Sequence, residues 1–138
     1  MNLKQQLKLH EGVEKYPYED TVGKLTIGVG WNLSDRGLPD FIIDALLDHA
    51  IEEAKAELDR VFPVWSGLSR ARKQVLVDMM FNLGAPRFMT FHRFRKALTM
   101  GQFDEAAKEM LDSKWAKQVG KRAERLAKMM RFDEFLEE

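Results

Sequence analysis

The chain has 138 residues, a length that suits one domain or a small lobe packed on a larger one. It contains no cysteine, which excludes disulfides and thiolate metal sites, and its 45% hydrophobic and 32% charged residues are typical of a globular protein. The net charge of zero conceals an asymmetry, because residues 1–60 carry 7 basic and 12 acidic side chains whereas residues 61–131 carry 15 basic and 6 acidic ones. The basic segment either attracts a polyanion or forms solvated helix faces, and no nucleic-acid-binding motif accompanies it.

The N-terminal segment predicts a short helix. Leu3, Leu7 and Glu11 recur at helical spacing, and Gly12 follows as a C-cap. This segment is too polar for a signal peptide, and no run in the chain approaches the ~18 apolar residues of a membrane span. We therefore expect synthesis in a reducing cytosol and no stable membrane association.

Residues 13–34 predict a small antiparallel sheet. From Leu25 to Leu33, apolar residues alternate with polar residues or glycine, which is the period of a half-buried strand pair. Residues 16–23 supply a first strand and a turn. One face is expected to be apolar, while the other carries Thr26, Gly28 and Gly30. Glycines in a strand mark close approach of a ligand or of a neighbouring element, and both interpretations remain open here.

The rest of the chain predicts helices. A helix over about 39–60, with Pro39 in its first turn, connects the sheet lobe to a helical lobe spanning about 62–138. Ser69 is the expected N-cap of a helix over 70–83. Residues 75–83 of this helix are apolar nearly all round, which predicts a place at the centre of the lobe. Shorter helices follow at about 90–100, 103–112, 114–118 and 120–130. The predicted fold is a single α+β domain over residues 1–138, mainly helical.

Two carboxyl groups are candidates for acid–base chemistry. Glu11 interrupts an apolar stripe at a helix C-terminus, where burial and the helix dipole both disfavour a negative charge and so suit a general acid. It could also be an exposed residue beside Lys8 and Lys15. Asp20 lies at the strand turn, where an aspartate commonly caps local amides. Glycoside hydrolysis uses two carboxyl groups, and a separation of ~6.5–9.5 Å leaves room for an attacking water.

A sequence resemblance adds to this pattern. The residues Glu11-Gly12, Asp20-Thr21, Gly23 and 26–30 (TIGVG) closely resemble the lysozymes of T-even bacteriophages and their endolysin relatives. Further similarity covers residues 72–84, 103–107, 113–115 and 122–125. Many relatives carry a histidine where this chain has Trp31, so the ion pair that such a histidine makes is absent. The resemblance implies a lysozyme-like fold of two lobes with a cleft between them.

The same resemblance implies specific roles for six residues. Glu11 would protonate the leaving oxygen, Asp20 would activate a water with inversion at the sugar carbon, and Thr26 would help to hold that water. Arg122 would pair with Glu11 and support its position. Phe81 and Asn82 would contact the substrate sugars.

The implied activity is a muramidase that cuts the β-linkage between N-acetylmuramic acid and N-acetylglucosamine in bacterial peptidoglycan and so lyses the host. We expect a monomer without a cofactor, held in the host cytoplasm until its release to the periplasm. The three histidines lack a paired ligand spacing, so no metal site is expected. The alternatives are a lytic transglycosylase, a catalytically silent wall-binding protein and a polyanion-binding helical domain.

Overall fold

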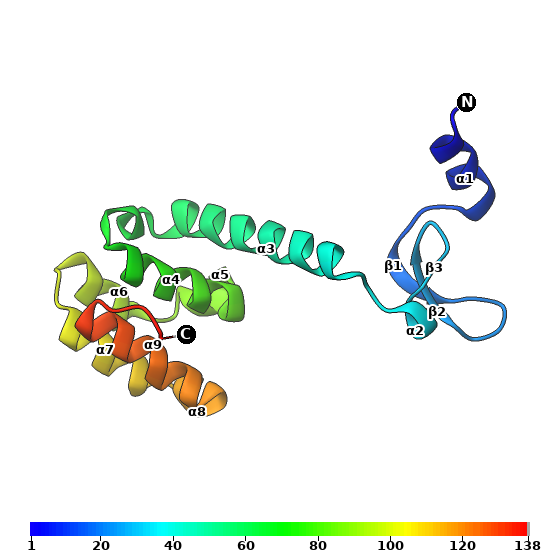
Figure 1. The fold of residues 1–138 in the computed structure, drawn as a ribbon. Helices are drawn as coiled ribbons and strands as arrows, with labels where there is room; N and C mark the ends of the chain where they lie inside the picture. Colours follow the sequence, from blue (N-terminus) through cyan, green and yellow to red (C-terminus); the bar gives the residue numbers. More distant parts are fainter. Residues whose placement is uncertain (138) are drawn as a thin grey trace. The chain divides into compact units, whose positions relative to one another are not determined.

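The computed structural model describes residues 1–137, and the chain divides into two compact units, Met1–Leu46 and Leu47–Glu138 (Figure 1). The long helix α3 (Asp40–Val61) contributes residues to both units. The prediction of a mainly helical α+β fold with one small antiparallel sheet is confirmed. The predicted single domain over 1–138 and its lobe boundaries stay predictions.

The first unit begins with helix α1 (Leu3–Glu11), which has a cap at each end. Asn2 Oδ1 accepts a hydrogen bond from the Gln5 backbone N–H at 2.9 Å, and Gln5 Oε1 accepts one from the Asn2 N–H at 2.8 Å. This reciprocal capping box satisfies two N–H groups that the helix itself leaves free. At the other end Gly12 has φ +78°, so α1 stops directly after Glu11.

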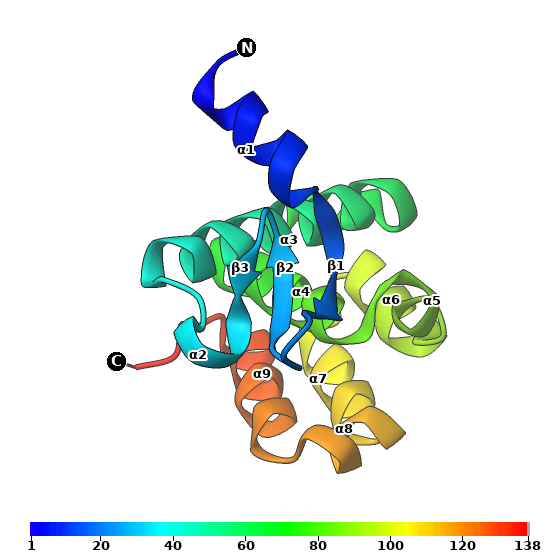
Figure 2. The same ribbon diagram turned by 90° about the vertical axis from the view of Figure 1, so that its right-hand side faces the viewer.

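A three-stranded antiparallel sheet follows, formed by β1 (Glu14–Glu19), β2 (Leu25–Gly28) and β3 (Trp31–Asn32) in that order (Figure 2). Leu25, on the predicted apolar face of the sheet, is 42% exposed, whereas Thr26 on the other face is 4% exposed. Leu25 is the first residue of β2 and pairs with Glu19 at the end of the sheet. Thr26 tolerates burial because its hydroxyl donates to the Lys24 carbonyl at 3.0 Å.

The segment after the sheet forms a single helical turn, α2 (Leu33–Arg36), which the sequence analysis did not predict. The Asn32 side chain caps this turn by accepting from the Asp35 N–H at 3.0 Å. An asparagine before a four-residue helix gives too short a pattern for periodicity to detect.

The second unit is helical throughout its regular structure. After α3 it contains the 3-10 turn η1 (Pro63–Gly67), α4 (Arg70–Leu83), α5 (Ala85–Phe88), α6 (His92–Thr99), α7 (Phe103–Leu111), α8 (Lys114–Val119) and α9 (Lys121–Phe132). Helix α4 has the predicted bounds, with Ser69 as N-cap and Gly84 as C-cap, and it packs against α9 (Figure 1). The largest fully buried side chains are Leu58, Val75, Leu76, Met79, Phe88, Phe94, Met110 and Met130.

Arg72 ties the start of α4 to the end of α9. Its Nε donates to the Met130 carbonyl at 2.8 Å, and its guanidinium lies 3.6 Å above the centre of the Phe103 ring. The free carbonyls at a helix C-terminus need such donors. Within residues 1–137, the helices lack the combined length and apolar character that crossing a membrane requires.

Candidate active site

Glu11 is the last residue of α1, and its carboxyl group lies against the loop between β2 and β3. A Cβ atom placed on Gly30 would be 3.1 Å from Glu11 Oε2 and 3.6 Å from Glu11 Cδ. The backbone of Gly30 therefore forms a wall beside the carboxyl group. Within the first unit the Glu11 side chain is exposed, so its predicted burial in an apolar stripe is not found there.

Asp20 lies at the turn between β1 and β2 and is half-buried. Its Oδ1 accepts hydrogen bonds from the backbone N–H groups of Val22 at 2.9 Å and Lys24 at 2.8 Å. This is the local capping that a turn aspartate commonly makes. Both bonds use the same oxygen, so one carboxylate oxygen holds the side chain in place while the other remains for a water or substrate.

Thr26 shares a backbone partner with Asp20. The carbonyl of Lys24 accepts both the Asp20 N–H at 2.9 Å and the Thr26 hydroxyl at 3.0 Å. The hydroxyl proton of Thr26 is therefore occupied, and its oxygen lone pairs can still accept from a donor such as water. The structure thus brings Asp20 and Thr26 together, in the same unit as Glu11.

The two glycines beside Thr26 differ in their surroundings. Gly28 and Gly30 have φ of +69° and +68°, which glycine adopts most readily. A Cβ atom on Gly28 would meet nothing within 4 Å, whereas one on Gly30 would meet Glu11. The sequence left open whether a ligand or a neighbouring element approaches these glycines. At Gly30 the close neighbour in the structure is the side chain of Glu11 from α1.

Arg122 and Phe81, two predicted site residues of the second unit, line one cavity of about 280 Å³ between α3, α4 and α9. Arg122 Nε donates to Asp78 Oδ1 at 2.8 Å, and Phe81 is 49% exposed. The pairing of Arg122 with Glu11 stays a prediction. The sequence reasoning missed Asp78, although a single carboxylate within the apolar run of α4 was a detectable signal.

Asn82 is placed differently from its neighbour Phe81. Its Oδ1 accepts a hydrogen bond from the indole N–H of buried Trp115 at 2.8 Å. The side-chain carbonyl of Asn82 is thus engaged within the protein, and the two N–H bonds of its amide remain to donate. These two N–H bonds are available for its predicted contact with a sugar.

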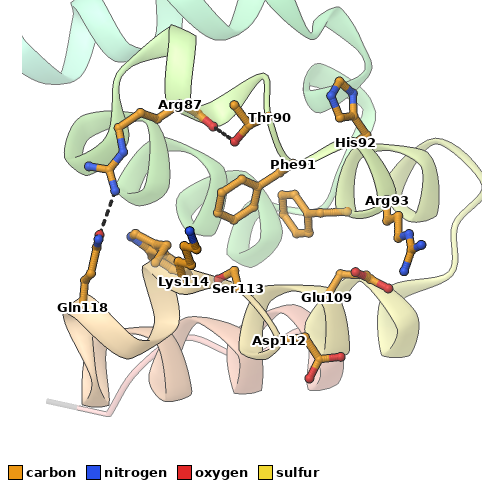
Figure 3. A pocket seen from close by; sticks show the side chains of 12 residues that line it. Arg87, Thr90, Phe91, His92, Arg93, Glu109, Asp112, Ser113, Lys114 and Gln118 are labelled. Atoms are coloured by element: carbon orange, nitrogen blue, oxygen red, sulfur yellow. Dashed lines mark hydrogen bonds between the residues drawn. The ribbon is translucent and has the colours of Figure 1, made fainter.

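A further cavity of the second unit is lined by none of the predicted catalytic residues (Figure 3). It has a volume of about 610 Å³ and lies between the α5–α6 segment, α7 and α8. Glu109 and Asp112, one helical turn apart, line it together with the aromatic rings of Phe91 and Trp115. Because two carboxyl groups beside aromatic rings could also bind and cleave a sugar, this cavity is a competing candidate.

No group of three histidine, aspartate or glutamate side chains is arranged to hold a metal ion in the part of the chain that the structure describes. Carboxyl and hydroxyl side chains such as those of Glu11, Asp20 and Thr26 can transfer protons and position a water molecule.

Comparisons with known proteins place the chain in a family. The family model for phage lysozyme matches residues 8–131. The chain is 25% identical to probable T4-type lysozyme 1 and 26% identical to probable T4-type lysozyme 2 of Dictyostelium discoideum, each over 154 aligned positions that cover 91% of both chains. It is 27% identical to the pre-baseplate central spike protein Gp5 of Enterobacteria phage T4, with 91% of this chain matching 27% of that protein.

Proposed function

The chain belongs to the phage lysozyme family, which makes it a lysozyme-type glycosidase, and we propose that it hydrolyses the β-linkage between N-acetylmuramic acid and N-acetylglucosamine in bacterial peptidoglycan. The observation that carries this proposal is the arrangement of the first unit. Glu11 ends a capped helix against the Gly30 backbone, and Asp20 is held in its turn by two N–H groups. One compact unit thus holds two carboxyl groups in defined surroundings, and glycoside hydrolysis uses two.

In the proposed reaction, Glu11 donates its proton to the glycosidic oxygen as the bond from that oxygen to the anomeric carbon breaks. The free oxygen of Asp20 accepts a proton from a water molecule, whose oxygen bonds to the anomeric carbon from the opposite face. The products are two sugar ends that together contain one added water, and the anomeric configuration is inverted. The Thr26 oxygen accepts a hydrogen bond from the attacking water.

Three residues of the second unit complete the proposal. The exposed ring of Phe81 offers an apolar surface to a sugar face, and the amide N–H groups of Asn82 can donate to sugar oxygens. Arg122, whose guanidinium carries five donors, can hold Asp78 and still bind a second carboxylate. We assign that second partner as Glu11 on the strength of the family resemblance.

The proposed biological role is lysis of a bacterial host by a monomeric enzyme, made in the host cytoplasm and released to the periplasm. Its partner there is the peptidoglycan sacculus. The support for this role is the resemblance to bacteriophage endolysins. The match to a spike protein of phage T4 raises a second possibility, a wall-cutting enzyme carried in the virion.

The experiment that tests the catalytic assignment compares two pairs of variants on purified peptidoglycan. We expect Glu11→Gln and Asp20→Asn each to lower the rate of reducing-end release by roughly 10²–10⁴-fold, the usual contribution of general acid–base catalysis. The matched controls are Glu109→Gln and Asp112→Asn in the cavity of Figure 3, and these should keep most of the rate. The opposite result would move the catalytic centre to that cavity.

Analysis of the products separates hydrolysis from the other chemistries. In water enriched in oxygen-18, a hydrolase adds one heavy oxygen to each new reducing end. A lytic transglycosylase instead leaves a 1,6-anhydro end without added water, and a silent wall-binding protein releases no fragments. Mass spectrometry of the soluble fragments distinguishes all three outcomes.

A further inference from the structure

The Glu11 carboxyl group lies beside the loop between β2 and β3. Val29 and Gly30 connect β2, which ends at Gly28, to Trp31 of β3. Gly30 is one of these two loop residues, and glycine restricts the backbone least. A contact that fixes the next residue, Trp31, therefore helps to hold Gly30 at its place beside Glu11.

The residue directly after Gly30 supplies such an attachment. The indole N–H of Trp31 donates to the Gly37 carbonyl at 2.7 Å, and the Arg36 guanidinium lies 3.7 Å above the centre of the Trp31 ring. The first contact is a short hydrogen bond and the second a cation–π interaction. We refer to Trp31, Arg36 and Gly37 as the Trp31 anchor.

The Trp31 anchor is itself connected to β2 through α2. Ser34 Oγ accepts from the Leu25 N–H at 2.8 Å, and Asp35 Oδ1 lies 3.0 Å from Lys24 Nζ. The backbone N–H of Lys24 is one of the two donors that hold Asp20. Direct contacts thus lead from α2 to Glu11 through Trp31 and Gly30, and to Asp20 through Lys24.

We propose that Trp31 is a positioning residue for the general acid Glu11, acting through the backbone of Gly30. This inference rests on the proposed function, because it takes Glu11 as the acid. A general acid works only within hydrogen-bond reach of the oxygen that it protonates, and a displacement of about 1 Å can lower the rate by about 10²-fold. Trp31 sets this distance without touching the substrate.

The test compares Trp31→Phe with Trp65→Phe. Phenylalanine keeps an aromatic ring beneath Arg36 and removes the indole N–H together with the five-membered part of the indole, and Trp65→Phe makes the same chemical change. Trp65 makes an indole hydrogen bond of the same length, 2.7 Å, to Asp59 in the second unit, so Trp65→Phe loses an equivalent bond away from Glu11. With soluble peptidoglycan oligomers, we expect Trp31→Phe to lower kcat by about tenfold or more with little change in KM, and Trp65→Phe to leave kcat unchanged. Equal kcat values for the two variants would overturn the proposal.

The same substitution in a Glu11→Gln background shows whether Trp31 acts through Glu11. We expect Trp31→Phe to cause no further loss there, because the group that it positions is already gone. An equal fold-loss in both backgrounds would mean that Trp31 acts by another route, and the proposal would fail while the proposed function stands. A fully active Glu11→Gln enzyme would contradict the acid assignment itself, which is a distinguishable failure.

A second variant covers the case in which Trp31→Phe does not fold. Arg36→Gln removes the stacked cation from the surface of the Trp31 anchor, and Arg70→Gln is a control at an exposed arginine of the second unit. We expect Arg36→Gln alone to lower kcat, by about threefold or more, in line with the free energy of an exposed cation–π contact. Identical kcat values for these two variants would also overturn the proposal.

Discussion

Gly30 combines a left-handed backbone with a close neighbour. Its φ is +68°, where a side chain costs about 1–2 kcal/mol, and a Cβ atom there would be 3.1 Å from the Glu11 carboxylate. We expect Gly30→Ala to lower stability by about that amount and kcat by roughly tenfold or more, because the added methyl group pushes the acid aside. Thermal unfolding and kcat on peptidoglycan oligomers measure the two effects.

Gly101 provides the matched control for this prediction. Its φ of +70° is almost the same, and a Cβ atom there would meet nothing within 4 Å. Gly101→Ala should therefore lose similar stability and keep its kcat. If both variants lose kcat equally, backbone strain alone accounts for the loss, and the contact with Glu11 does not matter.

At the scale of elements, the short helix α2 depends on a pair of charged side chains. The hydrogen bond from Lys24 to Asp35, followed by the one from Asn32, lowers the pKa of the Asp35 carboxyl below its ordinary value. Because the folded-state pKa is the lower one, the stabilisation is complete above the unfolded pKa and is lost as the pH falls through the folded-state value. The ionised Asp35 thus favours the attachment of α2 to Lys24 at neutral pH and ceases to do so in acid.

The prediction at this scale is a titration. In Lys24→Met, we expect the pKa of Asp35 to rise toward its ordinary value, because the largest cause of its lowering is gone. Carboxyl carbon NMR of the wild type and the variant measures the change directly. Lys15→Met, at an exposed lysine of β1, should leave the Asp35 titration where it is. An unchanged pKa in Lys24→Met would refute the ion pair in solution.

On the scale of the whole molecule, the two units differ in how much apolar surface they bury. Among residues 1–137, the buried hydrophobic side chains lie between Ala54 and Met130, in the second unit, whereas the buried residue of the first unit is Thr26. The second unit therefore has its own hydrophobic core. A substitution in this core should therefore destabilise the helices of the second unit more strongly than the β-sheet of the first unit.

Leu76→Ala tests this difference. Leu76 is fully buried, so its truncation should destabilise the core by about 2–5 kcal/mol. Amide hydrogen exchange should show reduced protection in α4, α7 and α9 and little change in β1 and β2. Leu111→Ala, at a leucine that is 43% exposed, should alter neither region strongly. An equal loss of protection in the sheet and the helices would mean that the chain unfolds as one cooperative unit.

Much of the architecture was predictable because its signals are local. The bounds of α4 follow from Ser69 and Gly84, and the long helix α3 follows from its apolar periodicity. The elements that prediction missed, α2, η1 and α5, contain four or five residues each, too few to establish a period. The exposure of Leu25 and the burial of Thr26 could not be predicted, because alternation shows that a strand has two faces without showing which residues its neighbours cover.

For the candidate site, the residue pattern left Glu11 and Asp20 open to purely structural interpretations, and the resemblance of the short motif over residues 11–30 to the phage lysozymes selected Glu11, Asp20 and Thr26. The tertiary contacts of the predicted site residues could not be inferred from the sequence pattern. Gly30 lies beside Glu11, Arg122 binds Asp78 across 44 positions, and Trp115 donates to Asn82 across 33. Partners that meet only after folding leave no periodic trace in the chain, because their pairing depends on how whole elements pack and not on the residues next to them.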